Sequence, residues 1–320
     1  MSSSNTFDPT TDIPDLTGKT YLVTGGSTGI GFGICAHLLQ HNARILLLSN
    51  KEDHAEDALE ELREYGDIKL VEWVKCDLAD LKATDAVAKQ ILEQESVLHG
   101  MVMNAGLGVG KYWETVDGLD SHFQVNWLSQ LHLTLELLPL LKKQPGGRLV
   151  FMSSDLHRGA EAETEFKDVA EINTDTGPMK LYNRSKLAQV LGMLAIQRRM
   201  QNGGDSVVNA TAQDKIYVNA THPGAVVTPQ QDQAVEAYGT LGKIGVKATR
   251  PFMKDPVKSG CRSALFAATS TEVEDQGITG KYIVPDKKVT EPSDKSQDVE
   301  LGERLWKLSL QLLDERLGST

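Results

Sequence analysis

The stretch Thr24-Gly25-Gly26-Ser27-Thr28-Gly29-Ile30-Gly31 follows an apolar run at residues 19–24 and leads into residues 30–41, where apolar residues have helical spacing. Its glycines at positions 25, 29 and 31 allow a tight turn and let a pyrophosphate approach the backbone. The N-terminus of the following helix then offers free N–H groups and a favourable dipole to an anion. The stretch therefore predicts a strand, a phosphate-binding loop and a helix, with a plain glycine-rich turn as the alternative.

From this loop onward, apolar runs and helical patterns alternate along the chain. Strands are expected at residues 19–24, 44–48, 69–75, 98–103, 148–153, 216–221 and 281–284, and helices at 30–41, 55–65, 81–95, 119–141, 181–200 and 257–269. Strands that alternate with helices indicate βαβ units, which build a parallel sheet covered on both faces. The sequence therefore predicts an α/β fold, a Rossmann-type doubly wound parallel sheet of about seven strands with helices on both faces.

The domain organisation follows from composition. No break in composition divides the chain, so residues 18–320 are expected to form one nucleotide-binding domain, preceded by a flexible arm at residues 1–17. Segments 155–180 and 225–255 fall outside the alternation of strands and helices. Long irregular segments inside a compact domain are often functional, so both segments are interpreted as substrate-loop insertions.

The bulk properties exclude several classes of protein. The chain has 320 residues and a formal net charge of −11, which argues against nucleic acid as a partner, because nucleic-acid phosphates are bound by clustered Lys and Arg. The polar start MSSSNTFDPTTDIPDL is unlike a secretory signal, and the apolar stretches are too short to span a membrane. Cys35, Cys76 and Cys261 are far apart and, like the eight histidines, show no metal-ligand spacing. A metal-free protein with reduced thiols, in the cytoplasm, is therefore expected.

The glycine spacing departs from the usual dinucleotide fingerprint, G-x-G-x-x-G, because three residues separate Gly25 from Gly29. It resembles instead the T-G-x-x-x-G-x-G motif of the short-chain dehydrogenase/reductases. Further motifs of that family follow in the family's order: Asn104-Ala105-Gly106, Asn126, Ser153-Ser154, Tyr182-x-x-x-Lys186, and Pro223-Gly224 with Thr228. The resemblance covers about residues 17–285, and the segment LYNRSKLAQVL is most similar to the retinol-dehydrogenase-like branch as found in filamentous fungi.

Tyr182 and Lys186 are four residues apart on an expected helix, so they share a face. A phenol has a pKa of about 10, and a neighbouring cation is expected to lower it, although a solvated Tyr–Lys pair is the alternative. The resemblance implies that Tyr182 is the general acid/base and that Lys186 tunes it and binds ribose hydroxyls. It also implies that Ser154 hydrogen-bonds the substrate oxygen and that Asn126 holds a water chain. Two alternatives stay open: Ser153 competes with Ser154, and Asn126 could serve only to tie a strand to a helix.

The resemblance implies a nicotinamide cofactor, bound at the glycine loop and at the ends of the strands. The residues expected to contact it are Gly25, Ser27, Thr28, Gly29, Ile30, Gly31, Ser49, Asn50, Lys51, Asp77, Leu78, Asn104, Ala105, Gly106, Tyr182, Lys186, Pro223, Gly224, Val226 and Thr228. Within this set, Asn104 is expected to brace neighbouring strands and Asp77 to meet the adenine. For Asp77, a helix N-cap at Asp77 or Asp80 is the alternative.

The end of the second strand favours NADP(H) over NAD(H). NAD-specific enzymes place an acid there, about 20 residues past the glycines, to bind the ribose 2′-hydroxyl. Here Ser49 holds that position, so no acid repels a 2′-phosphate, and Lys51 could pair with it. Against this preference, Asn50 stands where NADP-binding relatives usually have Arg, Glu52 and Asp53 are near, and Lys51 could be a solvated loop residue.

The substrate is expected to be a small-to-medium lipophilic carbonyl compound or alcohol, with secondary metabolites among the candidates. Tyr238, Leu241, Ile244 and Phe252 in segment 225–255 could form a lid over the nicotinamide, although they could equally be packing residues. Two alternative functions stay open: an enzyme of the same fold with no net redox chemistry, such as an epimerase or cyclase, and a catalytically silent NADP sensor. The family commonly dimerises through its two long helices, here 119–141 and 182–202, so a homodimer is expected, with a monomer as the alternative.

Overall fold

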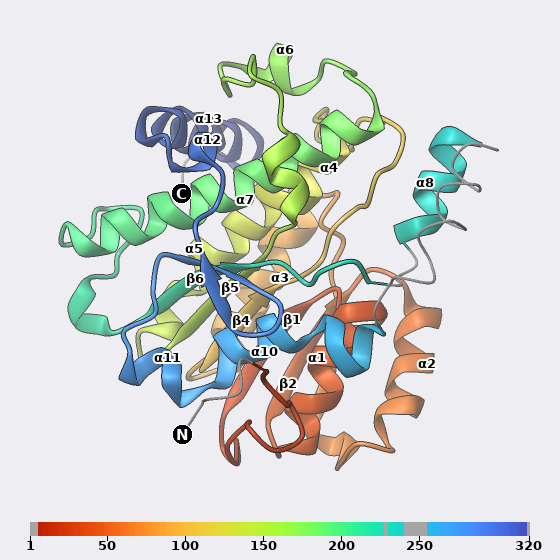
Figure 1. Ribbon diagram of the computed structural model, residues 1–320, viewed down its shortest axis with the longest axis vertical. Coiled ribbons are helices and arrows are strands. Elements are labelled where there is room, and N and C mark those ends of the chain that lie inside the picture. The colour runs from red at the N-terminus through yellow and green to blue at the C-terminus, as the bar shows by residue number, and fades with distance from the viewer. Residues whose placement is uncertain (1–5, 227–229, 240–254, 319–320) are drawn as a thin grey trace.

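The computed structural model describes residues 6–226, 230–239 and 255–318. A central sheet carries helices on both faces (Figure 1), and its strand order is β3-β2-β1-β4-β5-β6-β7-β8. The strands are β1 (Thr20–Thr24), β2 (Arg44–Ser49), β3 (Val71–Lys75), β4 (Gly100–Met103), β5 (Arg148–Met152), β6 (Tyr217–Thr221), β7 (Lys281–Val284) and β8 (Lys288–Thr290). Strands β1 to β7 pair in parallel, and β8 pairs antiparallel with β7.

The predicted α/β fold is confirmed, and the parallel region of the sheet has the seven strands expected. Strands β1, β4 and β5 are buried along their whole length, which explains why they appear in the sequence as continuous apolar runs. The eighth strand was missed because β8 is a three-residue edge strand, Lys-Val-Thr, with a single apolar residue that is itself exposed. Such a short edge strand leaves no periodic signal.

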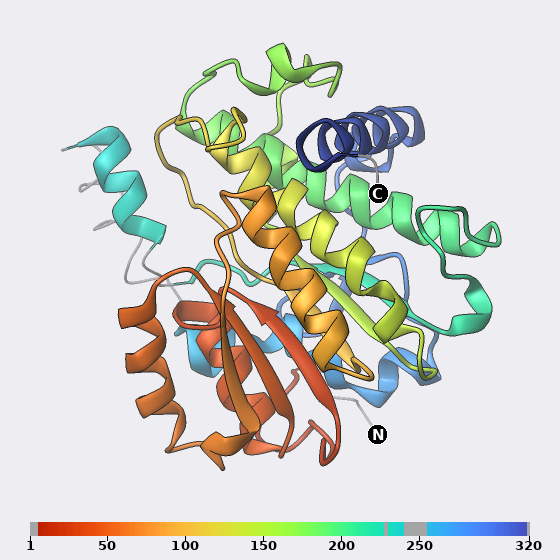
Figure 2. The ribbon, with the colours of Figure 1, turned by 180° about the vertical axis from the view of Figure 1, so that it is seen from behind.

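Helices cover the sheet in two layers. One layer contains α1 (Gly29–Gln40), α2 (Glu52–Leu62), α10 (Arg262–Thr269) and α11 (Thr271–Asp275), whose apolar residues join one core cluster. The other contains α3 (Leu81–Gln94), α5 (Ser129–Leu141), α7 (Pro178–Gln201) and α13 (Val299–Leu317), which lie together in front of the sheet in Figure 2 and form the second cluster. The helices on both faces therefore agree with the prediction.

The helix expected at 119–141 is interrupted in the structure. A short helix α4 (Ser121–Phe123) passes into a π-helical turn at Gln124–Leu128, and α5 follows. A second π-helical turn, Pro256–Gly260, replaces the start of the helix expected at 257–269. Such turns are often found at functional sites, and the first one carries Asn126.

The C-terminal helix α13 covers α7, which bears on the expected homodimer. The indole nitrogen of Trp127 donates to Ser309 Oγ at 2.9 Å, and the Arg199 guanidinium lies 4.2 Å from the Trp306 ring centroid. From Leu181 to Gln197, every residue of α7 except Leu194 is buried. An interface through α7 would therefore have to include or displace α13, and the homodimer through the two long helices stays a prediction.

The N-terminal segment packs against the domain from Phe7 onward. Phe7, Ile13 and Leu16 are buried, and the Phe7 ring meets Phe266 edge-on with centroids 5.7 Å apart. The Leu16 N–H also donates to the His41 carbonyl at 2.8 Å. The prediction of a flexible arm is therefore wrong for these residues, because isolated apolar residues among polar ones anchor the segment without producing a periodic pattern.

The two expected insertions differ in how much of them the structure describes. Segment 155–180 contains a 3₁₀ turn at Asp155–Gly159 and helix α6 (Val169–Ile172). In segment 225–255, the structure describes Ala225, Val226, helix α8 (Gln230–Tyr238) with the glycine after it, and Asp255. Four residues singled out from the sequence lie outside the described residues: Thr228, Leu241, Ile244 and Phe252.

Candidate active site

The predicted motifs meet at the point where the strand order reverses. Strands β1 and β4 are neighbours, while the chain runs outward from β1 to β3 on one side and from β4 to β7 on the other. In open α/β sheets, ligands bind outside the carboxyl ends of the strands at such a switch point. The glycine loop follows β1, Asn104-Ala105-Gly106 follows β4, Ser153-Ser154 follows β5, and Pro223-Gly224 comes after β6.

The glycine loop is shaped to receive an anion. Gly25 and Gly29 have φ values of +64° and +56°, a region that favours glycine. A Cβ on Gly31 would lie 2.0 Å from the Gly25 carbonyl oxygen, so the loop closes only with glycine at position 31. The N-cap residue Thr28 makes no side-chain capping bond, so its hydroxyl leaves the first-turn N–H groups of α1 to a ligand.

A buried brace joins the ends of β1 and β4. The Thr24 hydroxyl accepts from the backbone N–H groups of Asn104 and Ala105, both at 2.9 Å, and donates to Gln130 Oε1 at 3.2 Å. Asn104 Nδ2 donates to the carbonyls of Thr24 and Gly25 at 3.0 and 3.3 Å. Asn104 therefore occupies the bracing position predicted for it. Gln130 was missed, although it lies in α5 only four residues after Asn126.

Asn126 ties the loop after β4 to helix α7. Its Oδ1 accepts from the Leu107 N–H at 2.7 Å, and its Nδ2 donates to the Leu107 carbonyl and to Ser185 Oγ at 3.1 and 2.8 Å. Ser185 in turn donates to the Tyr182 carbonyl at 2.8 Å. A Cβ on Gly106 would lie 3.1 Å from Asn126 Oδ1, so the loop passes close to this amide. The tie of loop to helix, one of the two roles considered for Asn126, is thus present.

Tyr182 and Lys186 lie buried on one face of α7. The Lys186 ammonium is 5.5 Å from the centroid of the Tyr182 ring. It donates to the Met152 carbonyl at 2.9 Å and to Gln189 Oε1 at 3.0 Å. Because an ammonium has three N–H donors, one stays available for a ligand or for Tyr182. Gln189 was not predicted from the sequence, although it stands three residues after Lys186.

Burial dominates the protonation of this pair. It raises the pKa of Tyr182 to about 12, and a hydrogen bond with Ser154 opposes that shift. It also lowers the pKa of Lys186 to about 7. The expected lowering of the Tyr182 pKa by Lys186 is therefore not what the structure shows. The reason is that desolvation penalises both charged forms, while the ammonium is engaged by Met152 and Gln189.

The two neighbouring serines have different surroundings. The Ser153 hydroxyl donates to the Lys186 carbonyl at 2.9 Å, which fixes the end of β5 to α7. The Ser154 hydroxyl accepts from the Leu156 N–H at 3.2 Å and hydrogen-bonds Tyr182. Only Ser154 is thus placed beside the phenol, which favours it over Ser153 as the residue that meets a substrate oxygen.

The residues expected on the adenosine side lie at the ends of β2 and β3. Ser49 is buried, and its hydroxyl accepts from the Trp73 indole nitrogen at 3.0 Å, whereas Asn50 and Lys51 are exposed. Asp80, not Asp77, caps helix α3, because its carboxylate accepts from the Ala83 N–H at 3.0 Å.

Asp77 itself is exposed, and its carboxylate accepts from the Ala79 N–H at 3.0 Å. The next residue, Leu78, is buried, and its carbonyl accepts from Ser129 Oγ at 2.7 Å. This turn is therefore held from behind by α5, and Asp77 remains open to a ligand.

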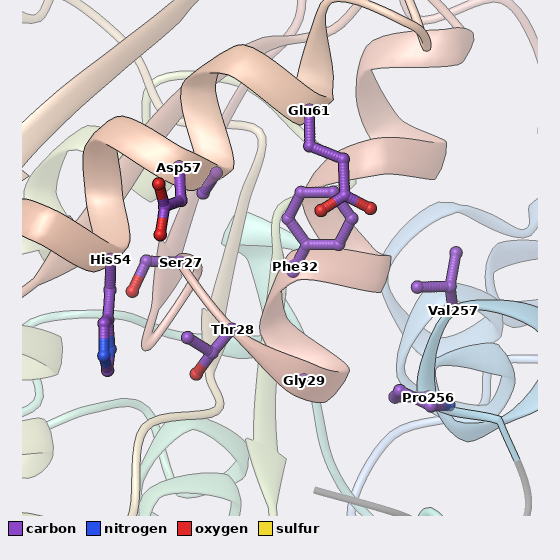
Figure 3. A pocket seen from close by; sticks show the side chains of 10 residues that line it. Ser27, Thr28, Gly29, Phe32, His54, Asp57, Glu61, Pro256 and Val257 are labelled. Atoms are coloured by element: carbon purple, nitrogen blue, oxygen red, sulfur yellow. The ribbon is translucent and has the colours of Figure 1, made fainter. Parts of the chain in front are cut away.

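A hollow of about 310 Å³ opens between the glycine loop and α2. Figure 3 shows His54 and Asp57 of α2 on the side of Ser27 and Thr28, with Glu61 and Phe32 beyond them. His54 was not predicted as a site residue. The imidazole of His54 and the carboxylates of Asp57 and Glu61 line the same hollow. The ring could hydrogen-bond a phosphate, whereas the carboxylates would repel it.

Comparison with known proteins agrees with this geometry. A family model described as short chain dehydrogenase matches residues 19–164. The chain is 34% identical over 315 residues to bli-4 of Neurospora crassa, a protein described as a mitochondrial oxidoreductase, with 95% of this chain and 74% of that protein covered. It is 33% identical over 314 residues to the short-chain dehydrogenase/reductase drtF of Aspergillus calidoustus, with 95% and 96% covered. The chain belongs to the short-chain dehydrogenase/reductase family.

This short-chain dehydrogenase/reductase also resembles human retinol dehydrogenase 14, at 31% identity over 307 residues, with 91% of this chain and 85% of that protein covered. The predicted family is therefore confirmed, with retinol-dehydrogenase-like and fungal relatives. Enzymes of the family are oxidoreductases that bind a nicotinamide cofactor and act on small molecules.

On the substrate side, the dehydrogenase/reductase fold brings a histidine next to the Pro-Gly turn. His222 Nδ1 accepts from the backbone N–H groups of Asp155 and Gly224, at 3.3 and 3.4 Å. This links the turn at Pro223-Gly224 to the residue after Ser154. Val226 is buried against Gly260, where an added Cβ would lie 2.8 Å from the valine Cγ1.

Helix α8 reaches the site from segment 225–255. The Gln233 side-chain oxygen accepts from the Gly108 N–H at 2.7 Å, and the Tyr238 hydroxyl accepts from the Met179 N–H at 3.3 Å. Met179 stands three residues before Tyr182, and the side chains of both Met179 and Tyr238 are exposed. An apolar side chain is therefore exposed about one helical turn before Tyr182 along the chain, with an exposed aromatic side chain hydrogen-bonded to its backbone.

Two further observations concern metals and membranes. Within residues 6–226, 230–239 and 255–318, no group of three or more His, Cys, Asp or Glu side chains is placed to hold a metal ion. Across the same described residues, no helix is both long and apolar enough to cross a membrane. Cys35, Cys76 and Cys261 are free and buried, and burial raises the pKa of each thiol.

Proposed function

We propose that this protein is an NADP(H)-dependent oxidoreductase that interconverts a lipophilic aldehyde or ketone and its alcohol, with Tyr182 as the general acid/base. The observation that carries the proposal is the pairing of the buried Tyr182 hydroxyl with the Ser154 hydroxyl, with the Lys186 ammonium 5.5 Å from the Tyr182 ring centroid. Each of these side chains comes from a motif of the family, and the fold brings them to one edge of the sheet.

The cofactor, when bound, supplies or accepts the hydride. In reduction, the hydroxyls of Ser154 and Tyr182 would bind the carbonyl oxygen, and Tyr182 would donate the proton that the developing alkoxide needs. The third N–H of Lys186 would bind a ribose hydroxyl, and the nearby positive charge of the ammonium would stabilise the phenolate left behind. Asn126, whose side chain is fixed by hydrogen bonds with Leu107 and Ser185, would position the water that returns a proton from solvent.

The residues present fit a dinucleotide. The glycine loop would hold the pyrophosphate, since its tight turn leaves no space for a Cβ at Gly31, and Gly106 would leave room beside Asn126 and Lys186. The exposed Asn50 and Lys51, together with the absence of an acid at Ser49, support NADP(H) over NAD(H). Asp77 would face the adenine from the end of β3.

The entrance supports a lipophilic substrate. Leu156, Met179 and Tyr238 are exposed. Leu156 and Met179 lie close in the chain to Ser154 and Tyr182, and the Tyr238 hydroxyl accepts from the Met179 N–H. An exposed apolar surface would favour a lipophilic ligand. The relative retinol dehydrogenase 14 is named after retinol, a lipophilic alcohol, and this supports the same substrate class. Secondary metabolites of small to medium size belong to this class.

A turnover assay with deuterated cofactor tests the proposal. NADPH and NADH, each labelled at the transferred position, are offered with a panel of lipophilic aldehydes and ketones, and the product alcohols are analysed by mass spectrometry. Direct transfer of one deuterium, faster with NADPH, is expected. Product formation without cofactor consumption would indicate epimerisation or cyclisation, and tight NADPH binding with no turnover would indicate a sensor.

The cytoplasmic location stays a prediction. Three free, buried thiols fit a reducing compartment, but the relative bli-4 is described as mitochondrial. Imaging of the tagged protein in cells, alongside cytoplasmic and mitochondrial markers, distinguishes the two locations.

A further inference from the structure

We infer that His157 is a positioning residue, whose imidazole fixes the backbone at Ser154 and joins that turn to the C-terminal segment 291–296. The inference rests on the role proposed for Ser154. His157 is buried in the 3₁₀ turn that Ser154 begins. Its Nδ1 lies 2.7 Å from the Ser154 carbonyl oxygen, and its Nε2 lies 3.0 Å from the Ser293 backbone nitrogen.

The hydrogen-bond partners define one tautomer of His157. The Ser293 N–H can only donate, so Nε2 must be the accepting nitrogen. The Ser154 carbonyl can only accept, so the proton must be on Nδ1. Both bonds are made only by the neutral ring protonated at Nδ1. Burial lowers the pKa of His157 and keeps this form at neutral pH, with the Ser154 carbonyl opposing that shift.

The imidazole acts on Ser154 through its backbone. The Ser154 carbonyl accepts twice from His157, from its N–H at 3.0 Å and from its Nδ1 at 2.7 Å. On the other side of the peptide, the Asp155 N–H donates to His222. Two imidazoles therefore hold the backbone that carries the Ser154 hydroxyl. Since that hydroxyl pairs with Tyr182, an error in its position would reach the reacting atoms directly.

The same imidazole also closes a strap, which we define as residues 291–296. Arg158 donates to the Glu291 carbonyl at 2.7 Å, and Lys295 donates to the carbonyls of Glu161 and Ala162 at 2.7 and 2.6 Å. The His157 ring meets Tyr282 of β7 edge-on, with centroids 4.9 Å apart. Of these contacts, the bond from His157 is the one that continues to Ser154, so the other strap contacts serve as controls.

Two substitutions separate the two halves of this role. In His157→Asn the amide N–H stands near the place of Nδ1 and can still donate to Ser154, but the side chain is too short for Ser293. In His157→Gln the amide oxygen reaches toward Ser293, but no donor remains beside the Ser154 carbonyl. We expect His157→Gln to lower kcat by at least about tenfold. We expect His157→Asn to keep kcat within about threefold of wild type, since the Ser154 bond survives.

Lys295→Met is the matched control, because it removes a strap contact and leaves His157 and Ser154 in place. It should lower the melting temperature without changing kcat, and both His157 variants should bind NADPH like wild type. Equal kcat losses in the Asn and Gln variants, or a larger loss in Asn, would overturn the inference. If wild type transfers no label, the proposed function itself fails, and nitrogen NMR still tests the structural claim: a proton on Nε2 of His157 would refute the tautomer.

Discussion

The two walls of the substrate side are held in very different ways. The wall built by segment 155–180 is tied to α7 by a buried arginine: Arg184 pairs with the fully buried Asp120 at 3.3 Å and donates to the Glu171 carbonyl at 2.7 Å. The other wall is α8, whose described residues are connected to the body by a pair of hydrogen bonds, from Gly108 to Gln233 and from Met179 to Tyr238. The first wall lies between Ser154 and Tyr182 in the chain, next to the residues proposed for proton transfer, and the second contacts Gly108 and Met179.

This difference has an energetic basis. Removing one partner of a buried ion pair costs about 3–5 kcal/mol, because the other charge is left without compensation. Removing one hydrogen bond at a partly exposed site costs about 0.5–1.5 kcal/mol. The walls therefore differ in how much change they tolerate. Substitutions in α8 can alter which substrates enter without unfolding the protein, while those behind Ser154 and Tyr182 disturb both fold and chemistry.

The largest effect is expected from Tyr182→Phe, which tests whether the side of the site next to the first wall carries the proposed chemistry. The change removes one oxygen and little volume, so the fold should survive. Turnover should fall by at least about 100-fold, the lower bound for general acid–base catalysis. NADPH affinity, measured by fluorescence titration, should stay close to wild type because Lys186 provides the ribose contact. If the variant keeps near-normal turnover and binds NADPH normally, the proposed role of Tyr182 is wrong and only the nucleotide-binding fold is supported.

Arg184→Met tests how strongly the first wall is anchored. It leaves the Asp120 carboxylate buried without its cation and removes the donor to Glu171. The free energy of unfolding, measured in urea, should fall by about 3 kcal/mol. The matched control is Lys180→Met, which removes the exposed ion pair with Glu161 and should change the free energy of unfolding far less. Similar losses in both variants would mean that the buried arginine does not anchor the first wall.

The buried Lys186 of α7, the helix to which the first wall is tied, makes the stability of the protein depend on pH. Its pKa is lowered from 10.5 to about 7, so above pH 7 the folded protein binds fewer protons than the unfolded chain. Stability then rises with pH between these two values, by up to about 1.4 kcal/mol per pH unit. Below pH 7 both states carry the proton, and the full cost of the buried charge is present.

The measurement compares wild type with Lys186→Met in urea at pH 7 and pH 9. Other groups titrate alike in both proteins and cancel in the difference. The stability of wild type relative to the variant should increase by about 2 kcal/mol over this interval. A difference that does not change with pH would mean that Lys186 stays charged in the folded protein.

The elements that the sequence predicted well are those with a strong repeating pattern. Strands buried on both faces appear as apolar runs, and the glycine loop needs glycine for steric reasons, as Gly31 shows. The helix α13 and the strand β8 were not predicted, and the interruption of the helix at Gln124–Leu128 has no signature in the spacing of apolar residues. The spacing of apolar residues indicates how a segment is buried, but it does not show which distant segment packs against it.

The candidate site shows the same limit at single residues. Tyr182, Lys186 and Ser154 were predicted because the family motifs carry them. Gln189 and His157 were not, because their roles depend on partners that only folding brings near, such as Ser293, 136 residues along the chain from His157. The pKa of Tyr182 was also predicted in the wrong direction, since burial cannot be judged from a spacing of four residues.

The smallest effect is expected at the second wall, from Gln233→Leu and Tyr238→Phe. Each removes one acceptor, for the N–H of Gly108 or of Met179, and leaves the fold of α8 intact. One hydrogen bond of about 1 kcal/mol corresponds to a change of roughly fivefold. We expect that change in KM for a bulky lipophilic substrate, with kcat, NADPH affinity and melting temperature unchanged. Glu236→Gln, an exposed position on the same helix, is the control and should alter none of these. If kcat falls while KM is constant, α8 takes part in the chemistry and the two walls are not separate in function.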